Sequence, residues 1–367
     1  MLFRALASAL FLFGTTATAA FGETRIVAWN VSPISDEGLA DRADAFAALG
    51  RDLDPDVVVL VETTGLEGAR TVGRLMGWTD YYVAVSDWRR SRTNPFFALE
   101  VAVLSKVPIE RVVEYDPSPD GTLRVVDQDG RPTGAEVEEI QPDTRGVAGV
   151  DPLARTDRVT MRVDLANGLT VLPVHLKSNR NGACYAADAA LDTLRRMGLP
   201  APDGLEDTLA TGFDRATGER RSNALKREWV MAAVKTAGDA AVAEGRTVLI
   251  AGYFNTTFEQ GLVGSSFEDC ELADYGCAKG PFPAEACRGD GYDDTFAILT
   301  EPLIGTTRWT IPTRNLPRTF DDKAFADRAI DHMAVPNSQT ELFGPASRSD
   351  ATYGSDHYPI LIEMLAR

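Results

Sequence analysis

The sequence predicts a single domain of mixed α and β structure. Short apolar runs typical of buried strands recur from Arg25 to Ile362, and several are separated by segments with apolar residues at helical spacing. No internal repeat, low-complexity segment or flexible linker divides the chain, so one domain with decorated loops is the simplest arrangement. Most of the apolar runs end on a polar side chain, which is how buried strands deliver functional groups to the edge of a sheet.

Residues 1–20 have the features of a secretory signal peptide. Arg4 is the only charge, an apolar core runs from Ala5 to Phe13, and Ala17-Thr18-Ala19 is an acceptable cleavage site. The apolar core is too short to span a bilayer, and no later stretch is long enough. We therefore expect an exported protein, periplasmic or extracellular, with no stable membrane insertion; an uncleaved anchor is the alternative.

The chain is strongly acidic. Its formal charge is −17, which becomes −18 when the segment that carries Arg4 is removed. This acidity works against a nucleic-acid-binding protein that relies on its overall field, although a basic patch or bound divalent cations can dominate a cleft. A monomer is the simplest expectation.

Four cysteines are an even number in a chain expected to be exported, which favours disulfides with three possible connectivities. A zinc site is the less favoured alternative because no Cys-x-x-Cys spacing occurs. The cysteines are Cys184, Cys270, Cys277 and Cys287.

The N-terminal half is predicted to alternate strands and helices. Helices are expected over Leu39–Leu53 and near Thr71–Met76. The predicted strands are Arg25–Trp29, Val57–Val61, Tyr81–Val85 and Val101–Leu104. The first two strands end at Asn30 and Glu62, and Glu100 precedes the last.

A basic island lies in the loop predicted over Asp87–Phe97. It consists of Arg89, Arg90 and Arg92, with Trp88 and Phe96-Phe97 beside them. Such an island could bind the phosphates of a nucleic acid despite the negative net charge of the chain. Alternatively, it could be an ordinary solvated loop.

The C-terminal half contains a helix predicted from Ser222 to about Val242. The predicted strands are Val159–Leu165, Leu169–Val174, Thr247–Ala251, Ala329–Val335 and Tyr358–Ile362. Asn167-Gly168 is a hairpin turn between the first two, and His175 ends the second. Three polar insertions are expected, near 108–155, near 180–221 and near 259–327. The first is predicted to contain a hairpin at Asp129-Gly130, and the last is predicted to be a long surface segment.

Polar residues at the ends of predicted strands form a candidate site. Each alone could be an ordinary turn former, but two of the three histidines of the chain are among them. Carboxylate and amide oxygens hold a hard cation that takes a substrate phosphate, and an oriented histidine stabilises phosphoryl oxygens. The set predicts metal-assisted phosphoester hydrolysis. It comprises Asn30, Glu62, His175, Asn255, Asp356 and His357. The third histidine, His332, is predicted to be structural because it points away from Asp331 in the same strand.

Six motifs in order resemble the endonuclease/exonuclease/phosphatase superfamily, which includes deoxyribonuclease I, abasic-site endonucleases, sphingomyelinases and inositol phosphatases. They are Trp29-Asn30, Val59-Leu60-Val61-Glu62, His175-Leu176-Lys177-Ser178, Gly252-Tyr253-Phe254-Asn255, Ile330-Asp331-His332 and Ser355-Asp356-His357. The resemblance implies an α/β (α+β), DNase I-like fold: a four-layer sandwich with two mainly antiparallel sheets packed between outer helices.

By the same resemblance, Asn30 and Glu62 would hold Mg²⁺, with Asp356 near the metal or the leaving group. Mn²⁺ or Ca²⁺ could take its place. His357 would lie beside the scissile phosphate and His175 would be the second histidine of the nuclease branch. Asp331 is expected to orient one histidine, Glu100 to pair with the other, and Asn255 to contact the phosphate.

The family's Gly-Asp-Phe-Asn motif is broken, because Tyr253 stands where its aspartate positions or deprotonates the attacking water. A phenol has an unperturbed pKa of about 10 and donates rather than accepts a proton at neutral pH. Loss of a general base costs a factor of about 10²–10⁴. One base change converts an Asp codon to a Tyr codon.

Three functions remain open. A nuclease-like phosphodiesterase acting on nucleic acid is favoured by His175 and His357 together with the basic island. A phospholipid or sugar-phosphate phosphodiesterase fits the acidity, with Trp88 and Phe96-Phe97 as modest candidates for lipid insertion. A catalytically inactive binding protein of the same fold is indicated by Tyr253 alone.

Overall fold

The computed structural model describes residues 22–32, 36–63, 65–86, 100–115, 122–140, 158, 160–178, 196–198, 223, 226–258, 295–301, 305–321 and 329–366. The predicted signal peptide, the four cysteines and the basic island with Arg89, Arg90 and Arg92 lie outside the described residues. Within the described part, no helix is long and apolar enough to cross a membrane.

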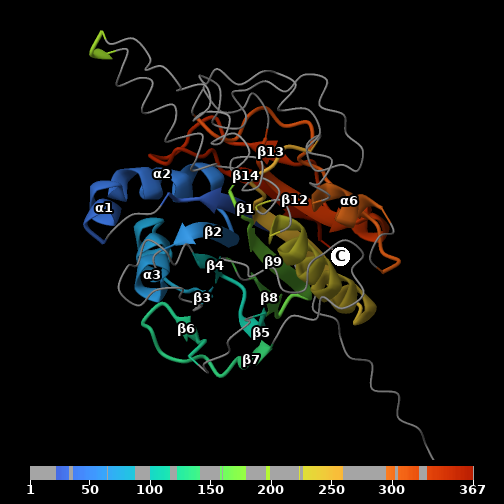
Figure 1. Cartoon of the computed structure of the whole chain (residues 1–367). Coiled ribbons are helices and arrows are strands. Elements are labelled where there is room, and N and C mark those ends of the chain that lie inside the picture. Colours follow the sequence, from blue (N-terminus) through green and yellow to red (C-terminus); the bar gives the residue numbers. More distant parts are fainter. Residues whose placement is uncertain are drawn as a thin grey trace, which may run out of the picture.

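Two sheets, each of seven strands among the described residues, form the centre of the molecule (Figure 1). The first contains β1 (Thr24–Asn30), β2 (Val57–Thr63), β3 (Tyr82–Val85), β4 (Glu100–Ser105), β6 (Val125–Asp127), β13 (Ser347–Arg348) and β14 (Ile360–Met364). The second contains β5 (Ile109–Tyr115), β7 (Glu136–Ile140), β8 (Thr160–Leu165), β9 (Leu169–His175), β10 (Thr247–Tyr253), β11 (Trp309–Thr310) and β12 (Asp331–Pro336).

The strand orders are β13-β14-β1-β2-β4-β3-β6 and β11-β12-β10-β9-β8-β5-β7. Three neighbouring pairs are parallel, namely β1–β2, β9–β10 and β5–β7, and the other pairs are antiparallel. The predicted pair of mainly antiparallel sheets is therefore confirmed.

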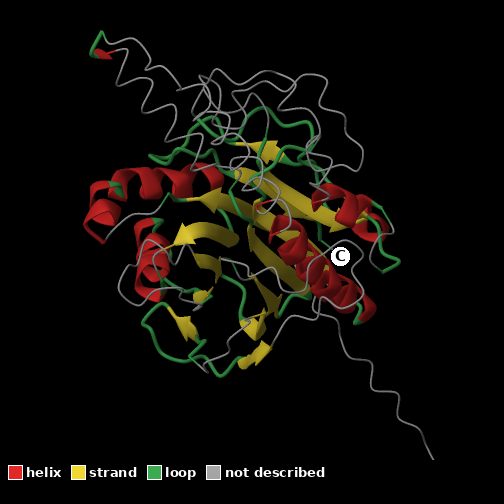
Figure 2. Cartoon of the chain, viewed as in Figure 1, coloured by secondary structure: helices red, strands yellow, loops and turns green. Residues whose placement is uncertain are grey.

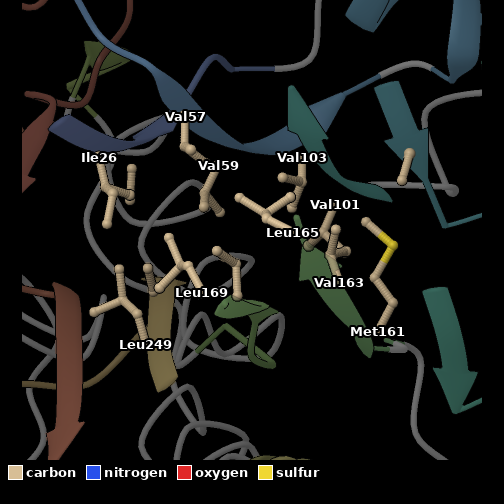
Figure 3. Packing of buried hydrophobic residues seen from close by; sticks show 14 of the residues in the cluster. Ile26, Val57, Val59, Val101, Val103, Met161, Val163, Leu165, Leu169 and Leu249 are labelled. Atoms are coloured by element: carbon tan, nitrogen blue, oxygen red, sulfur yellow. The ribbon is translucent and has the colours of Figure 1, made fainter. Parts of the chain in front are cut away.

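The main core lies between the sheets. Alternate residues of each central strand face it, as the period of a strand requires. On β1 these are Ile26 and Ala28, and on β10 they are Leu249 and Ala251 (Figure 3 shows part of this cluster). Because both faces of each sheet are covered, the strands are apolar at nearly every position, which explains the run Val57–Val61.

Helices cover the outer faces, giving four layers (Figure 2). On the first sheet, residues of α2 (Ala43–Leu53) and α3 (Leu66–Leu75) pack on Val27 and Trp29; α1 (Asp36–Asp41) precedes them. On the second sheet, a helix over 226–243 and α6 (Thr295–Thr300) pack on the alternate residues of β9 and β10. A 3-10 helix, η4 (Asn337–Leu342), follows β12.

The prediction of a surface segment over 259–327 is wrong where this segment is described. Phe296 and Leu299 of α6 are fully buried, and so is Trp309 of β11. The apolar run in α6 spans barely more than one helical turn, so no helical period could be recognised in it. Residues 108–155 hold β5, β6 and β7, which extend the edges of both sheets, and a hairpin turn at Asp129-Gly130 follows β6.

Candidate active site

The candidate site lies at one end of the sandwich because of the strand directions. β1 and β2 are parallel, as are β9 and β10, so the C-terminal ends within each pair lie together. β12 is antiparallel to β10 and β14 is antiparallel to β1. The starts of β12 and β14 therefore meet those same ends.

Four of the predicted residues continue the core-facing side of their strands. Asn30 follows Ile26 and Ala28 in the alternation along β1, and Tyr253 follows Leu249 and Ala251 along β10. In the same way His175 follows Val171 on β9, and Asp331 precedes Met333 on β12. At this end the inter-sheet face thus changes from apolar to polar.

Glu62 reaches the site through a backbone irregularity. By alternation it should face the helices, since Val58 and Leu60 do. Its φ is 64°, however, and the pairing of β2 with β4 shifts register between Val61 and Thr63. The bulge re-aims the side chain so that its Oε1 lies 3.6 Å from His175 Nε2.

His357 is the centre of the hydrogen-bond network. Its Nδ1 lies 2.8 Å from Asp331 Oδ2, and its Nε2 lies 3.4 Å from Asn30 Nδ2. A carboxylate only accepts, so Nδ1 carries the proton and Nε2 is the acceptor of the neutral ring. Burial disfavours the charged ring, but the charge and hydrogen bond of Asp331 outweigh this and raise the pKa of His357.

The turn before His357 is fixed to the end of β1. Ser355 Oγ donates to the Asn30 carbonyl at 2.7 Å and accepts from the His357 amide at 3.1 Å, and Trp29 Nε1 donates to the His357 carbonyl at 3.1 Å. Arg42, between α1 and α2, donates to the carbonyls of Val31 (2.6 Å) and Tyr353 (3.3 Å).

The sequence does not reveal the supporting role of these three residues. Ser355 and Trp29 lie within two of the six motifs, whereas Arg42 has no such marker because it lies within the segment predicted as one continuous helix.

The oxygens near Glu62 fit a hard divalent cation. Glu62 is hydrogen-bonded to Asn30, and Asp356 is exposed and close enough for its charge to act on Glu62. Burial raises the pKa of Glu62, with Asn30 and His357 opposing the shift, so its carboxylate is poorly solvated and a cation would stabilise it. Two carboxylates and one amide oxygen are fewer ligands than such an ion needs, so waters or substrate oxygens would complete the shell.

No group of three or more His, Cys, Asp or Glu side chains that could hold a metal occurs among the described residues. The candidate ligand set therefore depends on the amide oxygen of Asn30, which also accepts from the Ser32 amide at 2.8 Å. Arg158 is a further charged group near Glu62 that the sequence did not suggest, and its charge lowers the pKa of that carboxyl.

The turn after β10 is held close to β9. Gly252 has φ 143°, and a Cβ there would overlap the carbonyl oxygen of Val174. Asn255 has φ 59° and is buried, and its Nδ2 donates to the Leu176 carbonyl at 2.8 Å. This amide therefore joins the ends of β9 and β10, while the phosphate contact expected for it stays a prediction.

Tyr253 lies between the two histidines. Its ring is near-parallel to that of His175, with centroids 5.6 Å apart, and meets the ring of His357 edge-on at 4.5 Å. Phe320 packs against His357 at 4.8 Å. The ring of Tyr253 thus occupies the space between His175 and His357.

His332 is buried on the other face of β12, where its ring nitrogens lie 3.1 Å from Thr313 Oγ1 and 2.9 Å from the Ala329 carbonyl. This is the structural role predicted for it. Glu100 is buried at the start of β4, opposite Thr63, and its expected pairing with a histidine stays a prediction.

Two examples illustrate the solved structures that share this fold. An AP endonuclease from Leishmania major is 14% identical, with a TM-score of 0.50, 94% of this chain and 88% of that chain being covered. An endonuclease/exonuclease/phosphatase from Bacteroides vulgatus is 11% identical, also with a TM-score of 0.50, covering 95% of this chain and 100% of the other. No protein-family model matches the sequence, and no curated protein is significantly similar to it. The fold implied by the six motifs is confirmed.

Proposed function

We propose that this protein is an exported, Mg²⁺-dependent phosphodiesterase of the nuclease type, with its activity impaired by Tyr253. The observation that carries the proposal is the convergence of two histidines and two candidate metal-binding carboxylates at one end of the sandwich, around the hydrogen bond between Asp331 and His357. Nucleic acid is the favoured substrate because a protein of the same fold is an AP endonuclease.

The chain's own residues supply binding and proton transfer. His357, held by Asp331, offers Nε2 to the phosphoryl group or to its attacking nucleophile. His175, with Glu62 3.6 Å from its Nε2, is placed to donate to a departing oxygen. Asn30, Glu62 and Asp356 would hold Mg²⁺, which would neutralise charge on the phosphate when bound. We retain Arg89, Arg90 and Arg92 as proposed contacts to substrate phosphates, on the sequence alone.

The impairment follows from what a phenol cannot do. A water molecule between the histidines needs an acceptor for its proton, and a tyrosine hydroxyl at neutral pH is a poor one. The ring also takes up the space between His175 and His357. Both effects lower the rate of water attack.

The test compares the protein as it stands with Tyr253→Asp on supercoiled plasmid and on labelled oligonucleotides in the presence of Mg²⁺. We expect the variant to cut faster by a factor of about 10²–10⁴. Adding His357→Ala to this variant should remove the gain, which controls for a contaminating nuclease. If neither form cuts any nucleic acid, the nuclease proposal fails; hydrolysis of sphingomyelin or inositol phosphates instead would favour the lipid or sugar-phosphate alternative.

Export rests on residues 1–20 alone. N-terminal sequencing of the protein recovered outside the cytoplasm of an expressing bacterium should find a chain that begins just after Ala17-Thr18-Ala19. Recovery of an intact chain that begins at Met1 would contradict cleavage.

A further inference from the structure

We infer that Tyr253 is a nucleophile: its hydroxyl attacks the phosphodiester and forms a phosphotyrosyl intermediate. The inference rests on the proposed function, because it uses the same site and substrate class. It changes the attacking group from water to a side chain.

The length of the tyrosine side chain suits a nucleophile at position 253. The phenolic oxygen of a tyrosine extends beyond the position of an aspartate carboxylate oxygen by roughly one hydrogen-bond length, about 2.8 Å. A hydroxyl at the tip of Tyr253 would therefore take the place of a water held by a carboxylate at position 253. The oxygen that a water would present to the phosphorus is thus replaced by one that is covalently fixed to β10.

The ring of Tyr253 is held in a fixed orientation. Tyr253 follows Gly252 at the point where β10 approaches β9, and its ring contacts an imidazole on each side. These contacts restrict the rotation of the ring, so the hydroxyl is presented in one direction. Tyrosine is a known covalent nucleophile when a base lies beside it.

His357 is the base proposed for Tyr253. His357 has Nδ1 bonded to Asp331 and its acceptor nitrogen, Nε2, 3.4 Å from Asn30 Nδ2, and its ring lies 4.5 Å from the ring of Tyr253. To act as the base, Nε2 would exchange this long amide contact for the hydroxyl of Tyr253. Tyr253, His357 and Asp331 thus have the order of a nucleophile, a base and an orienting carboxylate.

The hydroxyl proton of Tyr253 passes to His357 Nε2 as a bond forms between the phenolic oxygen and phosphorus. The bond from phosphorus to the departing oxygen breaks, and that oxygen takes a proton from His175. The products are a free alcohol and a phosphodiester of Tyr253.

Hydrolysis of this adduct should be slow. A water that attacks it must approach the phosphorus with an acceptor for its proton, and position 253 no longer carries a carboxylate that could serve. The protein is therefore expected to release one equivalent of alcohol quickly and then to stall.

The experiment uses the full chain with Mg²⁺ and bis(4-nitrophenyl) phosphate as the probe. Its leaving group is more acidic than a tyrosine phenol, so transfer to Tyr253 is favourable and needs no proton donor. We expect a burst of about one equivalent of 4-nitrophenol per chain. Acid quenching, intact-protein mass spectrometry and peptide mapping should then find the nitrophenylphosphoryl group on Tyr253.

Two variants make the result decisive. Tyr253→Phe keeps the ring between the histidines and removes only the hydroxyl, so both burst and adduct should disappear while the thermal midpoint is retained. Tyr253→Asp should turn over continuously without an adduct. If Tyr253→Asp hydrolyses the probe but the unaltered chain shows no burst and no adduct, the nucleophile is refuted and the proposed function stands. An adduct on a residue other than Tyr253 also refutes the nucleophile. If no form of the protein reacts with the probe, the nucleophile and the proposed function are both refuted.

Discussion

Gly252 links the fold to the site, and replacing it with alanine tests how tightly β9 and β10 must approach. Its φ of 143° lies outside the range that a side chain tolerates, and an added Cβ would overlap the Val174 carbonyl oxygen. That oxygen belongs to β9, the parallel neighbour of β10. The variant must therefore strain the backbone or separate the two strands.

Both costs can be estimated. Holding a non-glycine residue in such a conformation costs about 1–3 kcal/mol. Separation would weaken the bond from the Leu176 amide to the Tyr253 carbonyl, 2.9 Å long, and at least one neighbouring bond of the ladder. At about 1 kcal/mol net for each bond, the free energy of unfolding should fall by about 3–5 kcal/mol in total.

Urea unfolding followed by circular dichroism measures this loss. Gly245→Ala is the matched control, since Gly245 also has a positive φ, 83°, but nothing lies within 4 Å of its added Cβ. In the control the free energy of unfolding should fall only by the cost of the left-handed backbone conformation, about 1–2 kcal/mol. Equal losses in the two variants would show that close approach of β9 and β10 does not matter, and the reasoning would be refuted.

Three further predictions follow from charged groups. Mg²⁺ should raise the thermal midpoint of the unaltered chain but not that of Glu62→Gln. The control variant Glu341→Gln changes an exposed carboxylate and should show the same shift as the unaltered chain. Equal shifts in Glu62→Gln and Glu341→Gln would exclude Glu62 from the metal site. Lys235 is fully buried, and its Nζ lies 2.6 Å from Asp239 Oδ2. Lys235→Met should lower the free energy of unfolding by about 3 kcal/mol, and Lys235→Met combined with Asp239→Asn should lower it by less, because the double variant leaves no unpaired charge. Urea unfolding measures both, and a double variant no more stable than the single variant would contradict this. The hydrogen bond from Arg162 of β8 lowers the pKa of Glu244, so the contribution of this carboxylate to stability is present above the unfolded pKa and is lost as pH falls through the lower folded value. In Glu244→Gln the free energy of unfolding should therefore differ less between pH 7 and pH 3 than in the unaltered chain, by a modest amount because the carboxylate is half exposed. An unchanged difference between the two pH values would contradict this.

The strand pattern predicted most of the fold because both faces of each sheet are covered. Strands such as Val57–Val61 are apolar throughout, so their ends are marked clearly by Asn30, Glu62 and His175. Short elements could not be predicted in this way. The apolar run of α6 is too short to show a helical period, although its burial is as complete as that of the central strands.

The members of the site could be read from the sequence, but part of its geometry could not. Strand alternation gives the direction of Asn30, Tyr253 and Asp331. It gives the wrong direction for Glu62, whose bulge has no marker such as a glycine in β2. Arg158 acts through proximity in space, and no spacing in the chain relates it to Glu62.

The same geometry explains how position 253 can change its chemistry without changing the fold. Among the described residues, the carboxylates of Glu62, Asp331 and Asp356 already lie near this space, and of these three Asp331 is the one bonded to a histidine at close range. An aspartate at 253 would add a fourth negative charge, which without a bound cation raises the mutual repulsion. Tyr253 avoids that charge and packs its ring on two imidazoles. Phenol and carboxylate are therefore both compatible with this sandwich, and they differ in the oxygen that they direct at the phosphate.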